Sequence, residues 1–160
     1  MNPPADPDTQ TLVFRRAAGE TTPAGRFPED LREWQSAVVL ARRVRQAMGL
    51  PPEAKSPPAA EALPAVLLWC LATGRYGSND IAALFAEEPM CRHLGGGHTF
   101  SWGEVQRFRR EQRGELATWL ARLLVFSWPG SPNDCAPGYP AEAERRLDLA
   151  TQTDHRELED

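Results

Sequence analysis

Apolar residues recur along much of this chain at three- and four-residue spacing, which is the period of an amphipathic α-helix. The first such run follows Pro28, Glu29 and Asp30, which favour a helix start, and stops at Gly49, a typical helix end. We therefore predict an amphipathic helix over residues 28–48. Its apolar positions are Leu31, Trp34, Val38, Ala41, Val44 and Met48. Its other side is typical of a solvated face and carries Arg32, Arg42, Arg43 and Arg45.

A second helix follows a proline-rich linker over residues 51–60. It begins near Glu61, has Pro64 in its first turn and stops at Gly74. Because apolar residues occupy all of its sides, we expect it to be the central, buried helix of the domain.

A third helix is predicted over residues 78–88, with Ser78 or Asn79 as its cap. Pro89 interrupts this helix, since proline removes a backbone donor and disfavours helix at the preceding residue. One more turn then leads into a triple glycine over residues 95–97, which we expect to be a loop.

The stretch SWGEVQRFRREQR over residues 101–113 combines a helix start with a dense group of arginines. Ser101 and Glu104 have the spacing of a capping box, in which each side chain accepts a hydrogen bond from a free backbone N–H group. At about 100° per residue, the apolar stripe and the arginines fall on different sides of this helix. The stripe is Val105, Phe108 and Gln112, and the basic flank is Arg107, Arg109, Arg110 and Arg113.

This helix is expected to continue to about Phe126, with a kink or break at Gly114. Since the chain shows no convincing sheet, the predicted fold is all-α, a compact multi-helix bundle with a helix-turn-helix-like unit and disordered N- and C-terminal tails.

The predicted domain organisation has three parts. Residues 1–25 form a mobile N-terminal tail, in which Thr11 to Arg16 is a short strand or a docking segment, and residues 26–127 form the helical domain. Residues 128–160 form a Pro/Gly-rich loop and an acidic C-terminal tail that frays, with a short helix over residues 142–149 as an alternative.

Composition narrows the class of protein. The chain has 160 residues, is 41% hydrophobic and carries a formal charge of -4, which argues against indiscriminate coating of nucleic acid. Lys55 is the single lysine among 18 basic residues, so basic contacts are made by guanidinium groups. Cys70, Cys91 and Cys135 stand in unlike contexts, which indicates a reducing compartment. Without a signal peptide or a span-length apolar run, we predict a cytoplasmic protein with no membrane partner, associated with the nucleoid if it binds DNA.

Part of the chain also resembles a known family, most strongly over residues 62–113. It is similar to the helical N-terminal domain of bacterial DDE-type insertion-sequence transposases of the InsH-like group. The matching features, in order, are ATG at 72–74, Ser78, the IAALF helix at 81–85, LGG at 94–96 and RFRR at 107–110. The resemblance implies binding to duplex DNA, such as insertion-sequence ends.

Two departures limit what this resemblance implies. The family usually has a histidine where this chain has Trp102, which is either a core or hydrophobic-staple residue or a wedge between bases. The family's catalytic domain, with three metal-binding carboxylates, should follow this region, but the residues after Phe126 lack the pattern of such a fold. We therefore predict no catalytic residues, no enzyme activity, no metal and no cofactor; the Cys91, His93 and His98 spacing is not that of a zinc site.

Three hypotheses remain from the sequence. The first is a DNA-binding domain whose basic edge also includes Arg75 and Arg92 as helpers; on the residue pattern alone, Arg107 and Arg110 fit DNA contacts or a solvated face. The second is a helical protein-interaction module, with its own copy or a transposase as partner. The third is a truncated transposase relic without a selected activity.

Overall fold

The computed structural model describes residues 27–128 and 138–159, and all of the regular structure in these ranges is helical. The order is a short 3-10 helix η1 (Leu31–Glu33), α2 (Ala37–Ala47), α3 (Ala59–Ala72), α4 (Ser78–Glu87), α5 (Pro89–Gly95), α6 (Trp102–Glu111), α7 (Arg113–Ser127) and α8 (Tyr139–Glu159). The predicted all-α class is thereby confirmed. The expectations for Thr11 to Arg16 and for Cys135 concern positions outside the described residues.

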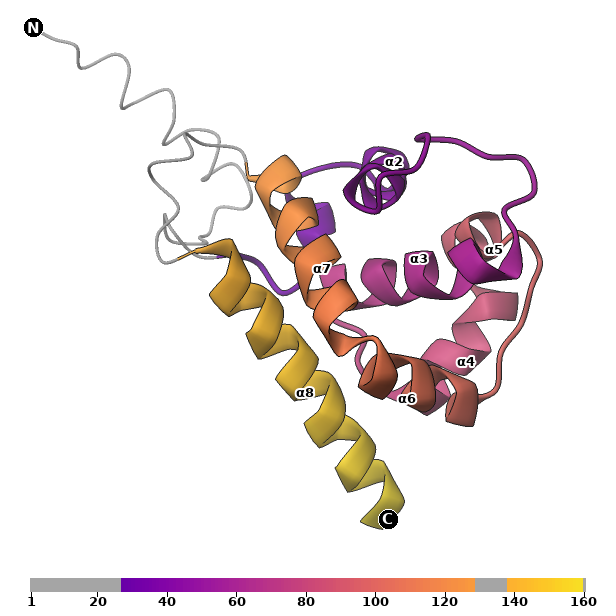
Figure 1. Ribbon diagram of the computed structural model, residues 1–160, viewed down its shortest axis with the longest axis vertical. Helices are drawn as coiled ribbons and strands as arrows, with labels where there is room; N and C mark the ends of the chain where they lie inside the picture. Colours follow the sequence, from indigo (N-terminus) through magenta and orange to yellow (C-terminus); the bar gives the residue numbers. More distant parts are fainter. Residues whose placement is uncertain (1–26, 129–137, 160) are drawn as a thin grey trace, which may run out of the picture.

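Helix α3 is the centre of the fold, as its uniformly apolar sequence predicts. Every residue from Ala62 to Ala72 is buried, because α2, α4, α5, α7 and α8 all pack against this helix (Figure 1). It starts at Ala59, so Pro64 lies inside the helix and not in its first turn. Burial of eleven consecutive residues makes α3 the main source of hydrophobic stabilisation.

The single helix predicted over residues 28–48 is divided into η1 and α2. Asp30 caps η1, and Ser36 starts α2 by accepting a hydrogen bond from the Val39 N–H at 3.2 Å. This new start changes which residues face inward: Leu40 is fully buried, whereas Val38 is 60% exposed. The prediction that Val38 belongs to the apolar stripe is therefore wrong.

The helix predicted from Ser101 to about Phe126 breaks at Gln112, two residues before the glycine expected to weaken it. Ser101 caps α6 as predicted, since its Oγ accepts from the Glu104 N–H at 3.2 Å. The break lets Val105 of α6 and Leu116 of α7 both become fully buried although the two helices run in different directions (Figure 1).

The C-terminal prediction needs correction, because residues 139–159 form a helix of 21 residues, which includes the alternative short helix over 142–149 but is not a fraying tail. Helix α8 lies along α7, and Ala143, Leu147 and Ala150 are buried at four- and three-residue spacing (Figure 1). Small and leucine side chains at these positions allow a highly charged helix to contribute one narrow apolar face. The folded domain therefore does not end near residue 127.

Candidate nucleic-acid interface

The four arginines of the basic flank have different environments, and Arg109 is the most buried, at 7% exposure. Its Nη1 donates to the Tyr76 carbonyl at 2.6 Å, and its Nη2 donates to Ser78 Oγ at 2.8 Å and pairs with Asp154 of α8. Asp154 also accepts from the Ser78 N–H at 2.9 Å, at the start of α4. Arg109 thus holds α4, α6 and α8 together, and its assignment to an exposed basic edge is corrected.

Arg113 also forms ion pairs with α8. Its Nη2 lies 2.7 Å from Glu144 and 2.7 Å from Asp148, and its side chain is 36% exposed. These two carboxylates offset its charge, so Arg113 adds little positive potential to the surface. No local signal predicts this pairing, because the two carboxylates lie 31 and 35 residues away in the sequence, on a segment expected to be largely unstructured.

Arg107 and Arg110 remain on the surface of α6. Both are exposed, and neither forms an ion pair or hydrogen bond within the residues that the structure describes. They are three residues apart on one helix, which places them side by side on its surface. These two guanidinium groups are therefore available to a ligand.

Arg75 and Arg92, the predicted helpers, are both exposed but lie on other elements. Arg75 follows α3, and its backbone N–H donates to the Cys70 carbonyl at 2.8 Å. Arg92 lies on α5, which packs mainly against α3 and α4. Neither residue lines the two cavities between α6 and α8.

A groove runs between α6 and the C-terminal half of α8. It consists of a cavity of about 300 Å³ and a smaller one of about 170 Å³ that share Gln106, Asp154 and Leu158. Trp102, in the first turn of α6, lines the smaller cavity and is 47% exposed, so its interpretation as a core residue is wrong. The remaining lining residues are Asn79, Arg109, Arg110, Arg113, Thr151, His155 and Glu157.

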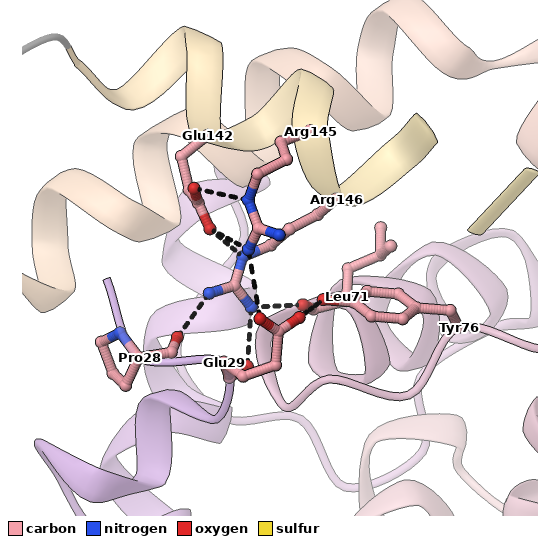
Figure 2. Close-up of polar contacts among 7 residues, drawn as sticks. All are labelled: Pro28, Glu29, Leu71, Tyr76, Glu142, Arg145 and Arg146. Atoms are coloured by element: carbon pink, nitrogen blue, oxygen red, sulfur yellow. Dashed lines mark hydrogen bonds and ion pairs between the residues drawn. The ribbon is translucent and has the colours of Figure 1, made fainter. Parts of the chain in front are cut away.

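Arg146 fixes α8 in the position that forms this groove (Figure 2). This arginine is fully buried, and its Nη groups donate to the carbonyls of Pro28 at 2.5 Å, Glu29 at 2.9 Å and Leu71 at 2.7 Å. Its Nε donates to Glu142 at 2.7 Å. The signal that could have revealed it is its place beside the apolar stripe of α8, where an unpaired arginine would be costly.

The two carboxyl groups near Arg146, those of Glu142 and Glu29, have lowered pKa values. Burial acts to raise the pKa of Glu142, but hydrogen bonds from Arg145 and Arg146 outweigh it and lower the pKa below 4.5. Glu29 behaves likewise: burial opposes ionisation, while a hydrogen bond from Tyr76 and the charge of Arg145 lower its pKa. Burial and then the hydrogen bond to Glu29 raise the pKa of Tyr76. Glu29 and Glu142 thus hold α8 against the start of the domain through Arg145 and Arg146.

Cysteine and histidine residues are arranged without metal-binding geometry in the described part of the chain, where no three His, Cys, Asp or Glu side chains form a candidate metal site. Cys91 is buried, His93 is exposed, and His98 contacts the Pro57 carbonyl at 3.2 Å. A hydrogen bond with Cys91, followed by burial, raises the pKa of the Cys70 thiol well above its ordinary value. Cys70 is therefore held as an unreactive thiol.

No protein-family model, curated protein or solved structure matches this chain. Among the described residues, none of the helices combines the length and the apolar character needed to cross a membrane.

Proposed function

We propose that this protein is a transposase-type N-terminal domain that binds duplex DNA and carries no catalytic activity of its own. The observation that supports this most is the division of the four arginines of the basic flank, three on α6 and Arg113 at the start of α7. Arg109 and Arg113 are bound by carboxylates of α8, whereas Arg107 and Arg110 are exposed and unpaired within the described ranges. Arg107 and Arg110 are therefore two adjacent cations that face solvent.

Two neighbouring guanidinium groups suit the phosphates of a DNA backbone. Each offers several N–H donors in a fixed plane, which favours bidentate contact with phosphate oxygens. Because such contacts release condensed counterions, affinity falls with salt by a slope of about 0.9 for each phosphate neutralised. Arg107 and Arg110 alone predict a weak, backbone-dominated interaction with a slope of about 2.

The same pairing argues against a catalytic role for the carboxylates beside α6. Asp154 is bound to Arg109 and Ser78, and Glu144 and Asp148 are bound to Arg113. Carboxylates so engaged are not free to bind a divalent metal. We therefore expect this chain to bind DNA at the nucleoid, in the cytoplasm. Any strand transfer would be carried out by another polypeptide.

Equilibrium binding to a labelled duplex at increasing salt tests this proposal. The expected result is measurable binding at low salt that weakens steadily as salt is added. Self-association that is insensitive to salt, with no retention of DNA at any concentration, would overturn it.

A second candidate function is self-association through the end of α7. Val125 and Phe126 are 45% and 41% exposed, and Val125 lines a mainly apolar groove of about 580 Å³ between α7 and the start of α8. Apolar side chains gathered beside a groove are a common feature of interfaces. Sedimentation equilibrium of the wild type and of Val125→Ser with Phe126→Ser tests this: a dimer that the variant abolishes supports it, and a monomeric wild type rejects it.

A further inference from the structure

Trp102 occupies an unusual place for a tryptophan in this domain, because it is half exposed on a helix whose surface is otherwise polar. Trp102, Gln106 and Arg110 follow one another at four-residue steps, so they form a continuous strip along α6 beside the groove. Trp102 and Arg110 are separated by two turns, or about 12 Å along the helix axis. The strip thus presents an aromatic ring at one end and a free cation at the other.

The smaller cavity has the composition of a slot for a planar, polar ring. Trp102 and Leu158, which is 66% exposed, supply its apolar surfaces from α6 and α8. Asn79 and Gln106 supply side-chain amides, each of which can donate and accept hydrogen bonds. Stacking on an aromatic side chain combined with amide hydrogen bonds is how proteins bind an unpaired nucleic-acid base.

The two carboxylates of the slot do not make it acidic. Asp154 is paired with Arg109. The carboxylate of Glu157 lies close to Gly77, the residue that precedes α4, since a Cβ added to Gly77 would be 2.3 Å from Glu157 Oε2. At that position the helix N-terminus offsets part of its negative charge. The unpaired guanidinium group of Arg110 in the adjoining cavity leaves that end of the groove suited to anions.

We propose that the groove between α6 and α8 binds single-stranded nucleic acid, with a base in the slot of Trp102 and Leu158 and a phosphate at Arg110. This inference rests on the proposed DNA-binding function, because both assign a phosphate contact to Arg110. It adds a second mode of contact, in which a frayed or displaced strand lies along α6. An acidic peptide would satisfy Arg110, but it would leave the aromatic ring and the two amides without a planar polar partner.

The test compares binding of the full chain to a single-stranded oligonucleotide of about 12 nucleotides and to a blunt duplex. Trp102→Ala should weaken single-strand binding roughly 5- to 150-fold, the range for loss of one stacked base. Trp102→Phe should retain most of the single-strand affinity. Neither variant should change duplex binding. Val38→Ala, which shortens an exposed apolar residue on α2, is the control and should bind as the wild type does.

The outcomes separate the two proposals. Duplex binding with no single-strand binding rejects the groove as a single-strand site and leaves the proposed function intact. Equal single-strand affinity of the wild type and Trp102→Ala also rejects it, as does displacement of the oligonucleotide by a glutamate oligomer that binds more tightly. Failure of the wild type to bind either nucleic acid rejects both proposals.

Discussion

Arg109 of α6 and Asp154 of α8 form a buried ion pair across 45 residues of sequence. Asp154 also accepts hydrogen bonds from the backbone N–H and the hydroxyl of Ser78, at 2.9 Å and 2.8 Å. One carboxylate therefore compensates a buried guanidinium group and satisfies a free donor at the start of α4. The network makes α8 an integral part of the domain.

Removing this carboxylate should be costly. Asp154→Ala leaves the Arg109 charge buried and unpaired, so we expect the free energy of unfolding to fall by about 3–5 kcal/mol in urea denaturation. Asp148→Asn is the matched control, because Asp148 is on the same helix and pairs with Arg113, but its side chain is 61% exposed. The control should cost no more than about 1 kcal/mol. Equal losses in the two variants would show that the buried network does not hold α8.

The neighbouring arginines of α8 offer a second comparison. Arg146→Ala removes the donor shared by the carbonyls of Pro28, Glu29 and Leu71, and leaves those of Pro28 and Leu71 buried without it. We expect a loss of about 3–5 kcal/mol. Arg145→Ala, whose side chain is 45% exposed, should cost about 1 kcal/mol or less. Thermal denaturation followed by circular dichroism distinguishes them; a smaller shift for Arg146→Ala than for Arg145→Ala is incompatible with the contacts of Figure 2.

Acid should weaken the attachment of α8. The pKa of Glu142 is lowered in the folded protein, so its ionised form stabilises the fold above its ordinary pKa of 4.5. This contribution is lost as the pH falls below 4.5 through the lower pKa of the folded state, and Glu29 acts in the same direction. In denaturation measured between about pH 6 and pH 3, Glu142→Gln should be less stable at pH 6 and should lose less stability on acidification. Parallel curves for the two proteins would contradict this account.

Freeing Arg113 should strengthen DNA binding. Glu144→Gln with Asp148→Asn removes both of its partners on α8, which frees a third cation at the start of α7, next to α6. The salt slope for duplex binding should then rise by about one unit. Glu33→Gln with Glu87→Gln makes the same change in net charge at two exposed carboxylates of η1 and α4, neither of which forms an ion pair in the described part of the chain, and controls for it. An equal gain in both variants would attribute the effect to net charge alone.

Local signals account for what the sequence predicts correctly. Ser101 accepts from a backbone group three residues later, and the uniformly apolar run around Val66 is buried, so both features can be read without knowledge of distant residues. Ser36 is equally local, yet the apolar spacing that continues past it masked its role as a cap. The cap at Ser36 therefore determines where α2 begins, although the apolar spacing continues past it.

The candidate site depends instead on contacts between distant segments. The burial of Arg109 is determined by Asp154, and that of Arg146 by the carbonyls at the start of the domain, none of which is near in sequence. The high charge of residues 139–159 concealed a narrow face of small apolar residues. Periodicity places Arg107 and Arg110 away from the apolar stripe, and both are exposed, but it cannot predict that α8 covers Arg109.

The most direct measurement of the central claim is the salt dependence of duplex binding by Arg107→Ala with Arg110→Ala. The slope of log affinity against log salt should decrease by about two units relative to the wild type. Arg42→Ala removes an exposed arginine, 53% accessible, from α2 and should leave the slope nearly unchanged. If the double variant keeps the wild-type slope and affinity, Arg107 and Arg110 do not contact DNA and the proposed function is wrong.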